Sequence, residues 1–196
     1  MFSLTGKQLA VVFVALISAC FAGFVSWAKL TKPLDNWYYD SLSRFHLSSP
    51  ANDVVIVAID ETSLQSMGRW PWPRDYHADL VERLIAADAQ AIVFDVIFSE
   101  YQQNEAGGLS AADQRFIANV ERAANVVFPV YFEHLGVGGP LFEVLPYEQL
   151  SQLAMGLGHA HVDFDTDAVA RGVYLKEGVG NAYWPPLSLT LASTLD

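Results

Sequence analysis

The sequence has only one cysteine, few basic residues and no low-complexity segment. Cys20 alone excludes an intramolecular disulfide and any zinc site built from several cysteines. Eleven Lys and Arg stand against 22 Asp and Glu, and the net charge of −11 argues against a nucleic-acid partner, whose phosphates would be repelled. The 196 residues, 52% of them hydrophobic, are enough to bury a core, which excludes intrinsic disorder as the main state.

Motifs that mark common enzyme sites are also missing. The sequence contains no Walker A pattern, no Gly-x-Ser-x-Gly elbow, no His-Glu-x-x-His and no Cys-x-x-Cys. Gly136, Gly138 and Gly139 do not stand between a strand and a helix as a dinucleotide-binding loop requires. We therefore expect no cofactor and no catalytic residues.

Charge is absent from twenty consecutive residues, Leu9–Ala28. At about 1.5 Å per residue, such a helix is roughly 30 Å long, which matches the hydrocarbon core of a bilayer. Trp27 near its end suits the interfacial aromatic belt. We predict a transmembrane helix over residues 9–28, preceded by a short cytoplasmic segment, residues 1–8.

Two alternatives to an uncleaved span are a cleaved signal peptide and a lipoprotein signal. The apolar core of a signal peptide is about 7–15 residues long, which is shorter than this run. Ile17–Cys20 resembles a lipobox, but eight more uncharged residues follow Cys20 and favour a span. Lys7 on one side and Lys29 and Lys32 on the other leave the orientation undecided by charge alone.

The rest of the chain divides into a juxtamembrane helix within residues 29–47 and one domain, residues 48–196. Leu34, Trp37, Tyr38 and Phe45 recur at helical spacing and form an apolar stripe. We expect this stripe to pack on the domain.

The domain shows three apolar runs that alternate with two amphipathic segments. The runs predict buried strands at Val54–Asp60, Ala91–Phe98 and Val126–Phe132, and the segments between them predict helices at Asp75–Ala87 and Ser110–Ala124. This order is typical of an α/β fold with a β-α-β-α-β parallel core. Pro129 indicates that the third strand lies at an edge.

The last third of the chain follows a different pattern. A short helical stretch near Tyr147–Met155 precedes two predicted strands, Gly158–Phe164 and Val169–Glu177, which form an antiparallel hairpin around a turn at Asp165–Asp167. Pro185-Pro186 opens a final helix.

A candidate ligand site lies at the carboxyl edge of the predicted sheet, where open α/β sheets bind ligands. Carboxylates, aromatic faces and one guanidinium in one crevice suit a small polar ligand. The six side chains are Asp60, Glu61, Trp70, Trp72, Arg74 and Asp95. The alternative is structural: the tryptophans cap the core, and Arg74 pairs with Asp60 or Asp95.

A second candidate group alternates along the late predicted strand. His159, His161, Asp163 and Asp165 would share one face of that strand, and His-x-His-x-Asp is a plausible metal-ligand spacing. We favour an exposed turn instead, because Asp and His are common in turns. An EF-hand is excluded, since Ala168 and Tyr174 stand where its loop needs Gly and Glu.

Several of these segments together resemble one known family. They are VVIVAID, then MGRWPWPR at Met67–Arg74, AIVFDVIFSE, NVVFPV, Gly158-His159 and DxDxxxR at Asp165–Arg171. Their order and spacing, over roughly residues 34–195, resemble the CHASE type 2 extracellular sensor (cyclase/histidine-kinase-associated sensing extracellular). Phe164 and Ala168 stand where the family often has Pro and Gly, which predicts a differently shaped turn.

The resemblance implies a signal-sensing module of a bacterial transmembrane receptor, with the amino terminus inside and the domain on the periplasmic side of the inner membrane. The output, a nucleotide cyclase or a histidine kinase, would lie outside this chain, which we interpret as a fragment or a short protein. We expect a homodimer that responds to an unknown small-molecule or ionic signal. The alternative function is a metal-dependent envelope hydrolase that uses Mg²⁺ on Asp60 and Asp95, and a third is a dimerisation unit without a ligand.

Overall fold

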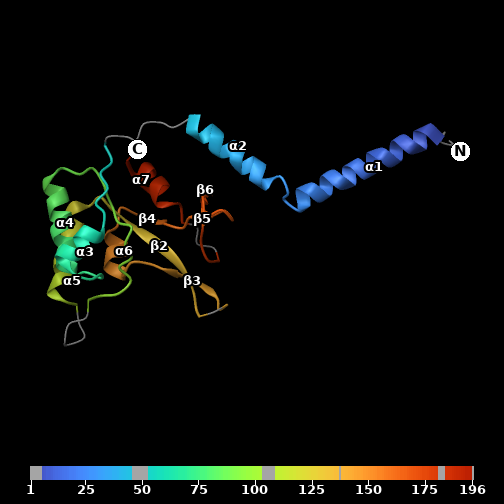
Figure 1. Ribbon diagram of the computed structural model, residues 1–196. Helices are drawn as coiled ribbons and strands as arrows, with labels where there is room; N and C mark the ends of the chain where they lie inside the picture. Colours follow the sequence, from blue (N-terminus) through green and yellow to red (C-terminus); the bar gives the residue numbers. More distant parts are fainter. Residues whose placement is uncertain (1–5, 46–52, 103–108, 137, 181–183, 196) are drawn as a thin grey trace. The chain divides into compact units, whose positions relative to one another are not determined.

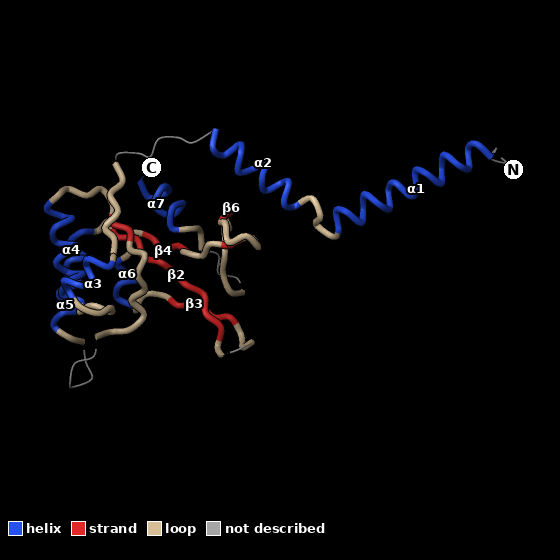
Figure 2. Tube along the Cα trace, viewed as in Figure 1, coloured by secondary structure: helices blue, strands red, loops and turns tan. Residues whose placement is uncertain are grey.

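The computed structural model describes residues 6–45, 53–102, 109–136, 138–180 and 184–195 (Figures 1 and 2). By its internal contacts the chain divides into two units, Met1–Ala58 and Ile59–Asp196. Each unit is described by itself.

In its described residues, 6–45 and 53–58, the first unit contains two helices, α1 (Gly6–Trp27) and α2 (Lys32–Phe45). In the described part of the chain, α1 is the one helix that is long and apolar enough to cross a bilayer. Lys29 adopts a left-handed backbone conformation, φ 51°, between the two helices, and Pro33 falls in the first turn of α2, where proline is tolerated. The predicted helical segments are therefore present, while the packing of α2 on the domain stays a prediction.

The second unit combines five helices with six strands among its described residues (Figure 1). The helices are α3 (Glu61–Met67), α4 (Arg74–Ala86), α5 (Ala111–Ala123), α6 (Glu148–Leu153) and α7 (Leu187–Leu195). The strands are β1 (Ile92–Val93), β2 (Val126–His134), β3 (Leu141–Val144), β4 (Gly156–His159), β5 (Asp163–Phe164) and β6 (Ala170–Gly172).

The core of the sheet is parallel, with β2 between β1 and β4. Along the chain this gives the order β1-α5-β2-α6-β4, to which β3 adds an antiparallel partner for the outer half of β2. The mixed α/β class is therefore confirmed, and the alternating parallel core begins one strand later than the sequence predicts.

The predicted first strand, Val54–Asp60, is the part of the fold that the sequence predicts wrongly. Residues 54–60 have no regular secondary structure, and Val55 and Ile56 are more than four-fifths exposed. An apolar run forms a strand only where a neighbouring strand supplies hydrogen-bond partners, and β1 pairs with β2 alone. Asp60 instead ends this segment as the N-cap of α3.

Pro129 lies in the central strand, so the predicted edge position is also wrong. Successive residues of β2 bond to opposite neighbours: Val126 O accepts from the β4 side and Val127 O from the β1 side. The nitrogen of Pro129 therefore faces the β1 side, beyond Val93, where the pairing with β1 has ended. A missing N–H at this position costs no ladder hydrogen bond.

The sheet carries helices on both faces. Val126 and Phe128 of β2 belong to the main core, together with residues of α4, α5 and α6. Helices α4 and α5 lie side by side over this face (Figure 1). The core also includes Phe94, Phe98 and Phe116, whose rings meet mostly edge to face.

The opposite face is covered by α7. Residues 127 and 129 of β2 point to this face because strand side chains alternate, and their partners in β4 are Gly156 and Gly158. Thr190 of α7 lies directly over both glycines. The absence of side chains at these two positions of β4 is what allows the backbone of α7 to approach so closely.

The late antiparallel hairpin is present but shorter than predicted. It consists of β5 and β6, whereas Gly158 and His159 belong to β4 and the parallel sheet. In the turn of the hairpin, Ala168 has a φ of 61°. This is the left-handed conformation that glycine adopts most easily, so the alanine occupies a backbone geometry suited to the glycine that the family often has there.

We expect Gly158→Ala to destabilise the domain by about 1–3 kcal/mol, because overpacking a close contact forces the backbone to move. A Cβ at this position would lie 2.9 Å from the Pro185 carbonyl oxygen and 3.0 Å from Leu187 Cα, both backbone atoms that cannot rotate away. The matched control is Gly172→Ala in β6, where a Cβ meets no atom within 4 Å. Equal denaturation midpoints for the two variants would contradict the close docking of α7.

Candidate functional site

A charged corner forms where the loop after α3 enters α4. Arg74 is the first residue of α4, and its side chain is only 15% exposed. Its Nε lies 3.5 Å from Oδ1 of Asp113, and its Nη2 donates to the Glu100 carbonyl oxygen at 2.9 Å. The guanidinium also lies over the Phe98 ring, 4.7 Å from the centroid. Arg74 thus connects α4 to α5 and to the loop after β1.

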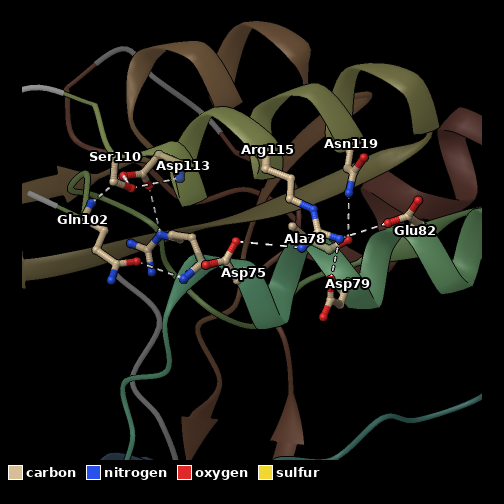
Figure 3. A network of polar contacts seen from close by, with 10 residues as sticks. Asp75, Ala78, Asp79, Glu82, Gln102, Ser110, Asp113, Arg115 and Asn119 are labelled. Atoms are coloured by element: carbon tan, nitrogen blue, oxygen red, sulfur yellow. Dashed lines mark hydrogen bonds and ion pairs between the residues drawn. The ribbon is translucent and has the colours of Figure 1, made fainter. Parts of the chain in front are cut away.

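Asp113 is fully buried and has two roles in this corner. Ser110 is the N-cap of α5 and accepts a hydrogen bond from the Asp113 backbone N–H, while its hydroxyl donates to Oδ2 of Asp113 (Figure 3). Oδ2 also accepts from the Gln102 N–H at 2.8 Å. The Gln102 side chain in turn accepts from the Arg74 N–H, which closes the network.

A second set of ionic contacts joins α4 and α5 on the solvent side (Figure 3). Arg115 of α5 pairs with Asp79 at 2.5 Å and with Glu82 at 3.1 Å, and all three side chains are about half exposed. Deeper between the helices, Asn119 donates to the Ala78 carbonyl oxygen. The same two helices are therefore joined by a buried ion pair at Arg74 and by exposed ion pairs at Arg115.

The two acidic residues predicted at the end of the first strand lie on α3. Asp60 caps this helix: its Oδ1 accepts from the Ser63 N–H at 2.8 Å and from the Ser63 hydroxyl at 2.7 Å. These hydrogen bonds, that of the hydroxyl first, lower the pKa of the Asp60 carboxyl. Glu61 follows in the first turn and is exposed.

Asp95 has a different partner from the one expected. Its Oδ1 accepts a hydrogen bond from the Tyr131 hydroxyl of β2 at 2.8 Å. Burial raises the pKa of Tyr131, and the hydrogen bond to Asp95 raises it further. The alternative interpretation paired Arg74 with Asp60 or Asp95, whereas its ionic partner is Asp113.

The two tryptophans of the loop differ in exposure. Trp72 is buried and donates from Nε1 to the Gly68 carbonyl oxygen, whereas Trp70 is 41% exposed. Trp70 meets both Trp72 and His77 edge to face, with centroids 5.7 Å apart in each case. The loop therefore presents one aromatic face to solvent and uses the other to cover the core.

His77 of α4 lies within the aromatic core and is 5% exposed. Its ring is surrounded by Phe94, Phe98 and Phe116. Burial, with a smaller contribution from the charge of Arg74, lowers the pKa of His77 to about 4. The imidazole is therefore neutral in the folded protein at physiological pH.

The hairpin carries the second candidate region. Arg171 of β6 donates to Asp165 at 2.8 Å and to Asp167 at 2.8 and 2.9 Å, and its hydrogen bonds lower the pKa of Asp167 to about 2. These are the charged residues of the DxDxxxR pattern. A half-open hollow of about 300 Å³ lies beside them, lined by Asp163, Asp165, Arg171, Gly172, Val173 and Tyr174.

The predicted histidines and Asp163 do not lie along one strand. His159 ends β4 and is buried, while Asp163 begins β5 and accepts from the Tyr174 hydroxyl. His161 lies between them and bonds to Glu177. Within the part of the chain that the structure describes, no three His, Cys, Asp or Glu side chains are placed to hold a metal ion.

Sequence reasoning missed Asp113, the residue that pairs with Arg74. A signal was available, since Ser110-x-x-Asp113 is the pattern of a capping box at the start of a helix. It would have placed Asp113 at the N-terminus of α5. It would not have revealed Arg74 as its partner, because the two residues come from helices that are distant in the sequence.

Comparison with known proteins identifies the family. The family model described as CHASE2 domain matches residues 11–196. The chain belongs to the CHASE2 family. CHASE2 domains are sensor domains of signal-transduction receptors, which agrees with a signal-sensing role and with the resemblance seen in the sequence. No curated protein and no solved structure matches the chain significantly.

Both charged regions, at Arg74 and at Arg171, lie within the residues that match the family. The RWPWPR segment, whose second arginine is Arg74, and the DxDxxxR hairpin each contain an arginine that pairs with carboxylates of the same CHASE2 chain. A sensory family is consistent with a region that does not itself catalyse a reaction.

We expect Arg74→Ala to lower the free energy of unfolding by about 3–5 kcal/mol, because it leaves the carboxylate of Asp113 buried without a counter-charge. Arg115→Ala is the matched control: it removes an arginine of similar size from the same helix pair, but from exposed ion pairs that contribute little. Urea denaturation followed by circular dichroism compares them. Similar losses of unfolding free energy for both variants would show that the buried ion pair stabilises the domain no more than the exposed ion pairs do.

We expect the domain to lose stability on acidification through His77. Its folded-state pKa of about 4 lies below the ordinary value of 6.5, so the unfolded chain takes up the proton first. The contribution of His77 is complete above pH 6.5 and is lost as the pH falls toward 4, by on the order of 2 kcal/mol. His77→Phe should flatten this dependence in thermal melts, whereas His134→Gln, at an exposed position, should leave it unchanged. An unaltered profile in His77→Phe would refute this assignment.

Proposed function

We propose that the chain is the extracytoplasmic sensor region of a bacterial transmembrane receptor. In this proposal α1 spans the inner membrane, the amino terminus lies in the cytoplasm, and the unit that begins at Ile59 faces the periplasm. The receptor relays an unknown small-molecule or ionic stimulus to a cytoplasmic output such as a nucleotide cyclase or a histidine kinase, and it works as a homodimer.

The observation that carries this proposal is the CHASE2 match over residues 11–196, which includes most of the apolar helix α1 together with the domain. An apolar helix of 22 residues, with Lys7 as its one charged side chain, is long enough to cross a bilayer. A sensor domain of receptors combined with such a helix supports a membrane-anchored sensor.

For the ligand site we keep the six residues named in the sequence. In this proposal the exposed members contact the ligand, and the buried members hold the site in shape. Trp70 offers an exposed aromatic face, and Asp60 and Glu61 offer exposed carboxylates. Trp72 and Arg74 hold the corner in place, since their polar atoms bond within the domain. Asp95, an exposed residue that accepts from the Tyr131 hydroxyl, completes the proposed set.

The competing function, a Mg²⁺-dependent hydrolase, requires Asp60 and Asp95 to act together. Their observed partners, Ser63 and Tyr131, are on different elements and give each carboxylate a separate structural role. Magnesium-dependent turnover of a phosphoester by the purified chain, lost in Asp60→Asn, would favour the hydrolase over the sensor.

The proposed topology predicts that a reporter enzyme active only in the periplasm gains activity when fused after Asp196. The same fusion without residues 6–27 is the control and should be inactive, because α1 is required for export. A reporter that functions only in the cytoplasm should be silent at the same position. Activity of the cytoplasmic reporter, with silence of the periplasmic one, would overturn this orientation.

A further inference from the structure

An exposed apolar stripe runs along α2, the helix that follows α1. The helix has no buried residue, and helical spacing places Leu34, Trp37, Tyr38 and Phe45 on one side of it. Each of these four side chains is more than three-fifths exposed. A contiguous exposed apolar surface usually marks a contact with a protein partner or with a membrane.

The opposite side of α2 is polar. Asn36, Asp40 and Ser43 follow one another at spacings of four and three residues and therefore share that face. Ser41 lies within the stripe, and its hydroxyl donates to the Trp37 carbonyl oxygen at 2.7 Å. The stripe can therefore leave water without stranding this hydrogen-bond donor.

The junction between α1 and α2 is held by backbone hydrogen bonds. Lys29, with a φ of 51°, ends α1, and its N–H donates to the Ser26 carbonyl oxygen. The Leu30 N–H donates to the Val25 carbonyl oxygen. These two bonds form a Schellman motif, which closes a helix and turns the chain away from its axis. The Thr31 carbonyl oxygen then accepts from two N–H groups in the first turn of α2.

This short junction keeps the start of α2 close to the end of α1. Four residues, 28–31, separate the two helices, and four residues reach at most about 14 Å. If α1 spans the bilayer, α2 therefore begins at the bilayer surface. Trp and Tyr, which the stripe contains, are enriched at that level of a membrane.

The charges around the stripe also suit a lipid surface. Residues 29–45 carry three basic and two acidic side chains, whereas residues 46–196 carry seven basic and 20 acidic ones. An anionic lipid surface attracts basic side chains and repels acidic ones. Residues 29–45 can therefore approach such a surface more readily than the acidic remainder of the chain.

We propose that α2 is an interfacial helix, whose stripe of Leu34, Trp37, Tyr38 and Phe45 lies in the surface of the bilayer that α1 crosses. This inference rests on the proposed function, because it requires α1 in the bilayer. It replaces the expectation that the stripe packs on the domain, since periodicity alone does not distinguish a protein surface from a lipid one. Helices of this kind bury their apolar face about 5–10 Å into the boundary between headgroups and acyl chains.

Nitroxide labels on the full chain in lipid nanodiscs test this placement. The nanodiscs contain phosphatidylethanolamine and phosphatidylglycerol, and Cys20→Ser removes the native cysteine. A single label is attached through Tyr38→Cys on the stripe or through Asn36→Cys on the opposite face. Oxygen, which concentrates in lipid, and a nickel chelate, which stays in water, report what each label contacts. The ratio of oxygen to nickel accessibility should be several-fold higher at position 38 than at position 36.

Two other results overturn the inference. Equal nickel accessibility at positions 36 and 38 means that the stripe faces water. Protection of position 38 from both reagents means that it packs on protein, either the domain or a second copy. A label through Leu16→Cys, within α1, tests the proposed function separately. If this label meets nickel, α1 lies outside the bilayer and the proposed function fails as well. If it meets oxygen alone, a negative result at position 38 refutes only the placement of α2.

A pair of charge substitutions provides a second measurement. With the label at position 38, Leu34→Asp adds a carboxylate to the stripe and should raise the nickel accessibility of the label several-fold, because a charge opposes insertion into an apolar environment. Asn36→Asp adds the same side chain to the opposite face and should leave this accessibility unchanged. Equal effects of the two substitutions would contradict the proposal.

Discussion

The buried contact between Arg74 and Asp113 is the interaction on which the packing of the domain depends. It fixes the beginnings of α4 and α5 relative to each other and holds the loop after β1 through Glu100 and Gln102. Removing two charges from water is costly, and the cost is offset only when further hydrogen bonds satisfy the same groups. The Ser110 hydroxyl and the Gln102 N–H supply such hydrogen bonds to Asp113, and the Glu100 carbonyl oxygen accepts one from Arg74.

The charged groups of this domain are paired more closely in some places than in others. At the corner, charges are matched and enclosed, which suits a frame that holds its shape while a stimulus is bound. At the end of β4, by contrast, His159 Nδ1 lies 3.6 Å from Glu177 Oε2, beyond hydrogen-bond distance, and that oxygen contacts the exposed His161 instead.

Periodicity in the sequence predicted those elements whose patterns are local. The helices α4 and α5, the strand β2 and the helix after Pro185-Pro186 all lie close to where spacing and caps placed them. Val54–Asp60 was predicted as a strand because most of its residues are apolar. An apolar run indicates that a segment can be buried, but it does not indicate whether a neighbouring strand is present to pair with it. The same limit explains why Asp113 was not identified as the partner of Arg74, since spacing carries no information about contacts between distant helices.

The left-handed backbone at Ala168 bears on how the hairpin can vary among relatives. A turn whose path depends on glycine alone loses that path when glycine is replaced. Here Arg171 binds Asp165 on one side and Asp167 on the other, so side-chain bonds determine the course of the chain around residue 168. Ala168→Gly would relax the left-handed backbone at this residue, whereas loss of Arg171 would remove the bonds that cross the turn.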